Sequence, residues 1–173
     1  MAQFKDRREA GRILAQELSA YAGRSDVIIF GLPRGGVPVA YEVAKALNAP
    51  LDICLVRKLG LPGHEELAIG AIASGGIRVL NEDIIHTLHI PEEMINLVTE
   101  QEFKELQRRE QSYRGDRPAL DAGGKTAILI DDGLATGASM RAAVTGVRTQ
   151  SPARIVIAVP TAAPETYNAL ELE

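Results

Sequence analysis

The chain has 173 residues, of which 46% are hydrophobic and 24% charged, and its formal net charge is −4. This composition is typical of one soluble globular domain, and the acidic balance disfavours a nucleic-acid partner because no segment is dominated by lysine and arginine. The single cysteine, Cys54, excludes an intramolecular disulfide and a cysteine-based metal site. No signal peptide is visible and no apolar run approaches the roughly 18 residues that cross a membrane, so we expect a cytoplasmic protein without a membrane partner.

The first third of the chain alternates helical and strand patterns. Asp6 with Glu9 three residues later is an N-cap pattern, and apolar residues then recur at helical spacing to residue 23. Residues 27–32 are a continuous apolar run, which predicts a buried strand followed by a second helix. Arg7 and Arg8 lie in the first turn of the first helix, and we interpret them as solvated side chains, although they could reach a phosphate.

A glycine-rich turn joins the first strand to the second helix, with the sequence Pro33-Arg34-Gly35-Gly36-Val37-Pro38. The main-chain N–H groups of such a turn converge before a helix N-terminus, an arrangement that suits phosphate binding. Many strand-to-helix connections contain a Gly-Gly pair, so this turn alone is weak evidence for a site.

The next segment combines a strand pattern with charged residues. Residues 51–56 predict a third strand that ends in Arg57-Lys58. Residues 59–67 show little apolar periodicity, which predicts a mobile loop, and Gly75-Gly76 between two short apolar runs predicts a hairpin. Two helical patterns follow, over residues 81–88 and from Pro91 to about Tyr113.

Residues 127–139 read Ala-Ile-Leu-Ile-Asp-Asp-Gly-Leu-Ala-Thr-Gly-Ala-Ser. The apolar run predicts a parallel strand buried on both faces, with Asp131 and Asp132 at its carboxyl edge, where α/β sheets bind ligands. The small residues after them let N–H groups converge on an anion such as phosphate. Two carboxylates would repel that phosphate unless they bind hydroxyl groups or a shared divalent cation, so the ligand that fits both is a sugar phosphate.

This stretch resembles the signature with which type I phosphoribosyltransferases bind 5-phosphoribosyl 1-diphosphate (PRPP). Together with the turn at Arg34 and the segment from Val56 to Ala73, it is similar to a bacterial group of that family whose acceptor is unassigned. The resemblance implies a single α/β domain over residues 1–173, with a central, mainly parallel sheet flanked by helices and a small hood at about residues 59–90. Relatives continue with another strand and a hairpin, so the chain is expected to be truncated, and an unpaired sheet edge would favour a homodimer.

The same resemblance implies a role for each candidate residue. Asp131 and Asp132 would bind the ribose hydroxyls and, through them or through water, Mg²⁺. The 5′-phosphate would bind the loop made of Ala135, Thr136, Gly137, Ala138 and Ser139. The diphosphate would be held by Arg34, Gly35, Gly36, Arg57 and Lys58. Candidates for catalysis are Arg57, Lys58, Glu65 and Glu66; for the two glutamates and for His64 the alternative is an exposed polar loop.

The activity implied is transfer of the 5-phosphoribosyl group of PRPP to a small nitrogen acceptor such as a nucleobase, with release of pyrophosphate and Mg²⁺ as cofactor. Ala135 stands where hypoxanthine-guanine enzymes carry an acid/base aspartate, so a 6-oxopurine acceptor is disfavoured. The alternative is a PRPP-binding regulatory module that has the same fold and no turnover.

Overall fold

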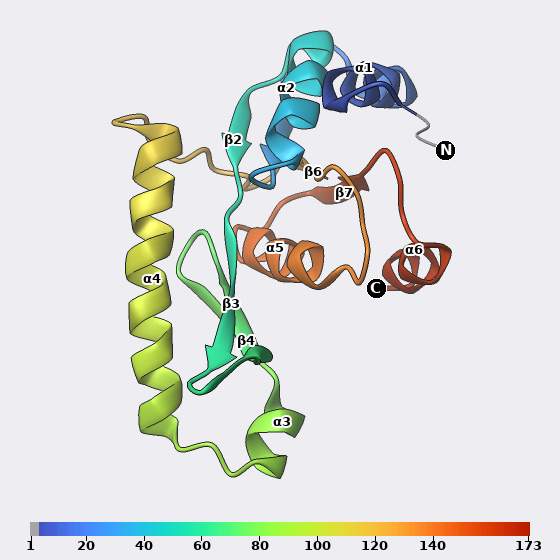
Figure 1. Ribbon diagram of the computed structural model, residues 1–173. Coiled ribbons are helices and arrows are strands. Elements are labelled where there is room, and N and C mark those ends of the chain that lie inside the picture. Colours follow the sequence, from blue (N-terminus) through green and yellow to red (C-terminus); the bar gives the residue numbers. More distant parts are fainter. Residues whose placement is uncertain (1–3) are drawn as a thin grey trace.

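The computed structural model describes residues 4–173. Along the chain its elements are α1 (Arg7–Glu17), the 3-10 helix η1 (Ser19–Tyr21), β1 (Val27–Gly31), α2 (Gly36–Leu47), β2 (Leu51–Ile53), β3 (Val56–Leu61), β4 (His64–Ala73), β5 (Ile77–Leu80), α3 (Glu82–Thr87), α4 (Glu92–Arg114), β6 (Thr126–Ile130), α5 (Ala138–Arg148), β7 (Arg154–Ala158) and α6 (Pro164–Glu171). Figure 1 shows two parts: a sheet with its helices, and an arm (residues 56–114) in which α4 runs beside the β3–β4 hairpin.

The larger sheet is parallel, with the strand order β2-β1-β6-β7. Side chains of β1 alternate between its faces: Val27 and Ile29 pack in the cluster formed with α1 and α2, whereas Ile28 and Phe30 pack in the cluster formed with α5. Strands covered on both faces carry continuous apolar sequences. The α/β fold with helices on both sides of a parallel sheet, predicted from the sequence, is therefore confirmed.

The strands of this sheet end together. Gly31 at the end of β1 pairs with Ile130 at the end of β6, and Ile130 pairs with Ala158 at the end of β7. Because the strands are parallel, the segments that follow β1, β6 and β7 all leave from the same edge. Anything that binds at this carboxyl edge can contact all three segments.

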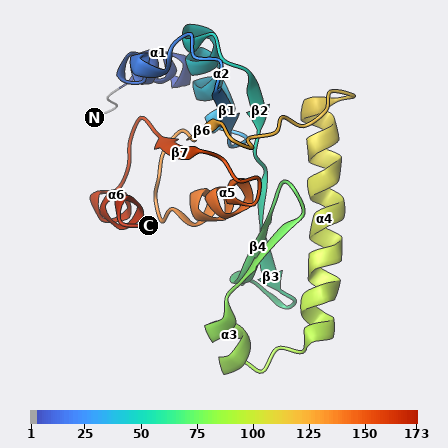
Figure 2. The same ribbon diagram turned by 180° about the vertical axis from the view of Figure 1, so that it is seen from behind.

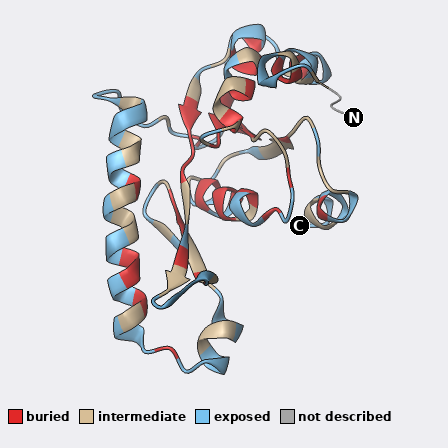
Figure 3. Ribbon diagram, in the orientation of Figure 1, coloured by how far each residue is buried: buried red, intermediate tan, exposed pale blue. Residues whose placement is uncertain are grey.

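The arm has a smaller antiparallel sheet in the order β3-β4-β5. One face of this sheet packs on α4 and shares with it a core that includes Leu59, Ile69, Ile72, Ile95 and Val98. Figure 2 shows α4 beside the hairpin from behind, and in Figure 3 the buried residues of α4 lie on its hairpin side while its outer side is exposed. Among the described helices none is both long and apolar enough to cross a membrane.

Two predictions about the arm are wrong. The strand predicted over residues 51–56 stops at Ile53, and Arg57-Lys58 lie inside β3, in the other sheet. The mobile loop predicted over residues 59–67 is instead the end of β3, a tight turn and the start of β4. The turn has Pro62 and Gly63 at its two central positions, with φ of Gly63 at +85°, the combination that a type II turn requires.

A buried charged contact joins the end of the arm to the parallel sheet. Asp52 of β2 accepts hydrogen bonds from Arg114 Nε and from the Leu120 N–H, each at 2.9 Å. The side chains of Asp52 and Arg114 are 6% and 15% exposed. This contact fixes the end of α4, and the chain that follows it, against the sheet.

Candidate functional site

The structure brings three of the predicted segments together at the carboxyl edge of the parallel sheet. The glycine turn follows β1, the two aspartates follow β6, and the loop over residues 133–137 leads from them into α5. Parallel pairing of Leu134 with Ala162 adds the segment after β7 to the same edge. The arrangement is the one expected for a ligand that spans neighbouring strand ends.

The two aspartates lie at the centre of this edge and are both half-buried. The Asp132 N–H donates to Asp131 Oδ1 at 2.8 Å, which orients the first carboxylate. Burial raises the pKa of Asp131 to about 6; the Asp132 N–H acts against this shift, and the Asp132 carboxyl adds to it. An ionised carboxylate accepts hydrogen bonds only, so above that pH the pair is suited to neighbouring hydroxyl groups.

Gly35 and Gly36 of the glycine turn are packed directly against the aspartates, which explains why these two positions have no side chain. A Cβ added to Gly35 would overlap Asp132 Oδ2, and one added to Gly36 would lie 2.6 Å from the Ile130 carbonyl oxygen. The Arg34 side chain is exposed, and the peptide bond before it is cis. The turn therefore presents main chain, and the charge of Arg34, beside the carboxylates.

Side chains of α6 and α5 hydrogen-bond to two carbonyl groups of the loop that precedes α5. Thr166 Oγ1 of α6 donates to the Ala135 carbonyl, and Arg141 Nη1 donates to the Thr136 carbonyl at 2.8 Å. Gly137 has φ of +80°, a conformation that favours glycine, and it is the N-cap of α5. With two carbonyls engaged from behind, the exposed residues Ala135, Thr136, Ala138 and Ser139 line the open side before the helix N-terminus. A loop that opens before a helix N-terminus in this way is a common arrangement for binding anions.

Arg57 and Lys58 do not act as a pair, because adjacent residues of a strand point to opposite faces. Arg57 Nε donates to Glu102 Oε2 of α4 at 2.5 Å, so this side chain faces the helix of the arm. Lys58 instead lines a cavity of about 380 Å³ between the arm and α5, together with Ala138 and Ser139. Only the lysine is near the loop before α5.

The hairpin tip carries the acidic candidates. Glu65 accepts a hydrogen bond from the Gly63 N–H at 3.3 Å, and His64 Nδ1 lies 3.8 Å from Glu66 Oε1. All three side chains of residues 64–66 are exposed. Figure 1 places the end of β3 near α3, far from the end of β6, so this structure does not bring the glutamates to the aspartates.

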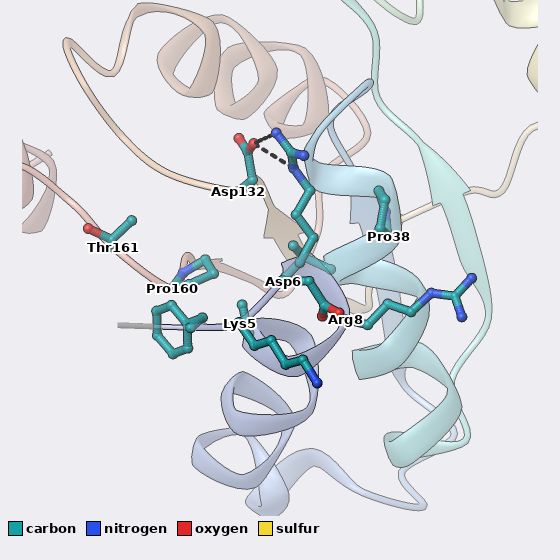
Figure 4. Close-up of a pocket in the computed structure, with 11 residues that line it drawn as sticks. Lys5, Asp6, Arg8, Pro38, Asp132, Pro160 and Thr161 are labelled. Carbon is teal, nitrogen blue, oxygen red and sulfur yellow. Dashed lines mark hydrogen bonds and ion pairs between the residues drawn. The ribbon is translucent and has the colours of Figure 1, made fainter. Parts of the chain in front are cut away.

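One residue at the site, Arg7, was interpreted from the sequence as solvated, with contact to a phosphate as the alternative. Arg7 turns back from α1, and its Nε and Nη2 each lie 3.0 Å from Asp132 Oδ2. Both residues line a cavity of about 670 Å³ whose other walls include Phe4, Pro38 and Pro160 (Figure 4). A helical pattern shows that Arg7 is in a first turn but not which element that turn faces.

The carboxylates also determine how a metal could bind. Within residues 4–173, no group of three or more His, Cys, Asp and Glu side chains is arranged to hold a metal ion. Mg²⁺ is commonly bound by one or two carboxylates together with substrate phosphates. Asp131 and Asp132 would contact such a metal indirectly, through water or the ribose hydroxyls of a substrate, whose phosphate oxygens would be among its ligands.

Comparison with known sequences is consistent with this geometry. The chain matches the family described as "Phosphoribosyl transferase domain" over residues 2–171. Two Mycobacterium tuberculosis proteins, "Putative phosphoribosyl transferase MT0597" and "Putative phosphoribosyl transferase Rv0571c", are 47% identical to it over 160 residues, 92% of this chain and 36% of each relative. The chain thus spans about a third of the length of these relatives.

Solved structures give the same relationship. The protein TT1426 from Thermus thermophilus has a TM-score of 0.81 and 41% identity, over 98% of this chain and 80% of that one. A purine phosphoribosyltransferase from Pyrococcus horikoshii has a TM-score of 0.53 and 21% identity, over 92% and 74% of the two chains, which shows a common fold. A family match over nearly the whole sequence, with these relatives, shows that the chain belongs to the phosphoribosyl transferase domain family.

Proposed function

We propose that this domain transfers the 5-phosphoribosyl group of PRPP to a nitrogen acceptor and releases pyrophosphate. The observation that carries the proposal is the meeting of three segments at one sheet edge: the Asp131-Asp132 pair, the Gly35-Gly36 turn packed on it, and the loop before α5. Carboxylates suit the ribose hydroxyls, and the two main-chain cradles suit a phosphate at each end of the same sugar.

Each segment then has one task. Asp131 and Asp132 hold the 2′- and 3′-hydroxyls, residues 135–139 hold the 5′-phosphate, and Arg34 with Gly35 and Gly36 holds the diphosphate. Mg²⁺, when bound, neutralises charge on the diphosphate oxygens. The C1–oxygen bond breaks with its electron pair leaving on pyrophosphate, C1 becomes oxocarbenium-like, and the acceptor nitrogen forms the new bond from the opposite face and loses a proton.

The cavity beside Asp132 is the proposed acceptor site. It has about 670 Å³ of volume, a size within the range of small-molecule sites, and it combines apolar walls from Phe4, Pro38 and Pro160 with the polar groups of Asp132 and Thr161. A flat heterocycle fits such walls. This position places the acceptor next to the carboxylate that would hold the ribose, and hence near C1. Within the cavity the acceptor would lie on the side of Pro160 and Thr161, which Figure 4 shows across Asp132 from Pro38, so that it faces C1 from the side opposite the glycine turn and the diphosphate.

The arm would act as a cover. Lys58 already lies near residues 138 and 139. Glu65 and Glu66 can serve in acceptor contact or proton transfer only if the hairpin tip moves toward the sheet edge, and Arg57 reaches the diphosphate only if its contact with Glu102 opens. Closure of a loop or hairpin would exclude water from an activated C1.

The buried thiol has no part in this chemistry. Burial raises the pKa of the Cys54 thiol to about 12, so it packs as a small apolar residue. A cytoplasmic location, which the sequence led us to expect, would keep it reduced.

Isothermal titration of PRPP, with and without Mg²⁺, tests the proposal. We expect Mg²⁺-dependent binding that is weakened about tenfold or more in Asp132→Asn, because a charged hydrogen-bond acceptor is lost. Asp116→Asn, at an exposed position just after the end of α4, is the matched control and should bind as the wild type does. Unchanged affinity of Asp132→Asn would reject the assignment of the ribose site.

A second assay separates an enzyme from a binding module. Pyrophosphate release would be measured with purines, pyrimidines and amines as acceptors, at PRPP concentrations that saturate the site. Release that depends on one acceptor class supports transfer. Binding of PRPP without release for any of them would favour the regulatory module of the same fold.

A further inference from the structure

Arg7 is held at the sheet edge by the packing of its helix. Helix α1 lies against α2 so closely that a Cβ on Gly11 would come within 2.8 Å of both Glu42 Cβ and the Val39 carbonyl. At its start, Asp6 caps the helix by accepting the Glu9 N–H at 2.8 Å. The first turn of α1 is therefore fixed in position, and only the side chain of Arg7 is free to rearrange.

The contact between Arg7 and Asp132 is poorly suited to a structural role. The two side chains are 60% and 36% exposed. Exposed ion pairs contribute little to stability, because water competes for both charges. A ligand that supplies hydroxyl groups to Asp132 and an anion to Arg7 can replace this contact, and neither charged side chain is then left without a partner.

The guanidinium lies where two parts of the proposed ligand would meet. Asp132 Oδ2 is 3.0 Å from Arg7 Nε and is also the atom nearest to the missing side chain of Gly35. In PRPP the diphosphate is attached to C1, the neighbour of the carbon that carries the 2′-hydroxyl. Because Asp132 is the carboxylate packed against Gly35 of the turn assigned to the diphosphate, we assign the 2′-hydroxyl to Asp132. A cation beside Asp132, such as Arg7, is then also beside the diphosphate.

The charges at the site require such a cation. PRPP is polyanionic, and the sheet edge presents the carboxyl groups of Asp131 and Asp132 to it. Arg34 is in the glycine turn, and Lys5, Arg7 and Arg8 line the cavity beside Asp132. Of these three, Arg7 is the one that contacts the Asp132 carboxylate, at 3.0 Å. A guanidinium can donate two parallel hydrogen bonds to one phosphate, which an ammonium group cannot.

We propose that Arg7 is a diphosphate-binding residue of the PRPP site, contributed by the N-terminal helix. It neutralises Asp132 while no ligand is bound, and it moves to the diphosphate when the ribose hydroxyls take the carboxylate. This assignment rests on the proposed PRPP-binding function. It adds a residue that belongs neither to the glycine turn nor to the loop before α5.

The test compares Arg7→Gln with the wild type by titration of three ligands: PRPP with Mg²⁺, pyrophosphate with Mg²⁺, and ribose 5-phosphate. We expect the variant to bind PRPP and pyrophosphate about ten- to a hundredfold more weakly, because hydrogen bonds between two charged groups are lost. Ribose 5-phosphate has no diphosphate, so its affinity should be unchanged or higher. Arg7→Lys keeps the positive charge but cannot donate two parallel hydrogen bonds to one phosphate, so it should show an intermediate loss of PRPP affinity.

Arg8→Gln is the matched control. Arg8 lies in the same turn, is exposed and also lines the cavity, but Figure 4 shows its side chain pointing away from Asp132. Its replacement removes the same charge from the same helix and should leave all three affinities unchanged. Equal thermal unfolding of the two glutamine variants would show that α1 is intact in both.

Three outcomes would overturn the assignment. Tighter binding of PRPP by Arg7→Gln would mean that Arg7 competes with PRPP for the Asp132 carboxylate. Equal weakening for ribose 5-phosphate and PRPP would mean that Arg7 acts only by orienting Asp132. If the wild type binds no PRPP, the proposed function fails together with this assignment, whereas a wild type that binds and an Arg7→Gln variant that binds equally well reject Arg7 alone.

Discussion

The parallel sheet and the arm are both built from strands and helices, but they differ in where charged side chains occur along their strands. In β1 and β6 every residue is buried, so charged groups occur only after the strands end. In β3 one face packs on α4 and the other is partly open, so Arg57 and Lys58 stay within the strand and point to opposite sides. The first arrangement gathers functional groups, and the second separates them.

This difference explains why the sheet edge is the candidate site, and it is consistent with the role of cover that we propose for the arm. Side chains at the ends of parallel strands come from segments far apart in sequence but fixed in register. Lys58 of the hairpin already lies near residues 138 and 139, but the side chains at the hairpin tip can reach that edge only by movement of the arm. Three substitutions test whether the two regions are as distinct as the structure indicates.

The largest effect is expected where the regions are joined. Arg114→Met leaves the buried Asp52 carboxylate without its cation, and loss of one partner of a buried pair commonly costs about 3–5 kcal/mol. Because the amides of Ile53 and Leu120 still donate to Asp52, we expect a loss of about 3 kcal/mol in the free energy of unfolding. Urea denaturation followed by circular dichroism measures it.

The control for the contact between Arg114 and Asp52 is another arginine of α4. Arg108 pairs with Glu105 at an exposed position, and Arg108→Met should change the stability little. Similar losses in the two variants would contradict a special role for the buried pair. PRPP binding by the folded fraction of Arg114→Met should persist, because the sheet edge keeps its contacts.

A smaller loss of stability, but a complete loss of function, is expected at the glycine turn. The Cβ of Gly36→Ala would lie 2.6 Å from the Ile130 carbonyl oxygen and 2.9 Å from the Asp131 Cα. Both neighbours are main-chain atoms that cannot rotate away, so we expect overpacking to cost about 2 kcal/mol and to displace the aspartates. Thermal unfolding and PRPP titration measure the two effects.

Gly146→Ala gives the comparison on the side of the arm. This glycine is also helical, but its added Cβ would meet Ala73 Cβ at 3.4 Å, an ordinary contact. Alanine is the better helix former by up to about 1 kcal/mol, so stability should be kept or increased. If Gly36→Ala, contrary to expectation, has the stability and PRPP affinity of the wild type, the glycine turn is not packed as tightly as described.

The sequence was informative where local pattern and tertiary structure agree. Continuous apolar runs predicted β1 and β6, and the small residues around Gly137 predicted a loop before a helix; the structure contains all of these. The apolar runs indicate strands that are buried on both faces. The small residues indicate a loop whose backbone packs closely against its neighbours. Both features can be recognised from residue types. The meeting of Asp131 with the glycine turn then follows from parallel pairing.

The failures concern which way a side chain faces. The segment from Leu61 to His64 was predicted as part of a loop because its strands lack clear alternation, although Pro62-Gly63 is a turn signal. Arg57 and Lys58 were treated as one pair, although neighbours in a strand diverge. Arg7 was interpreted as solvated because its partner is 125 residues away, a distance that no local pattern can bridge.

The smallest effect is expected from pH, and it concerns only the sheet edge. Burial raises the pKa of Asp131 from an ordinary value of 3.8 to about 6. Proton uptake by this group therefore stabilises the unliganded fold below pH 3.8, and that contribution is lost as the pH rises through about 6. Binding of a diol needs the ionised carboxylate, so PRPP affinity should fall by up to about tenfold per pH unit below about 6.

The ratio of the wild-type affinity to that of Asp131→Asn isolates this effect, since the phosphates of PRPP titrate identically with both proteins. Titrations between about pH 5 and pH 8 should show a ratio that rises with pH and levels off above about 7, where Asp131 is fully ionised. A ratio that stays constant would mean that Asp131 does not gain its charge in this range. A ratio near one at every pH would mean that Asp131 does not contact the ribose and only orients Asp132 through its hydrogen bond with the Asp132 N–H.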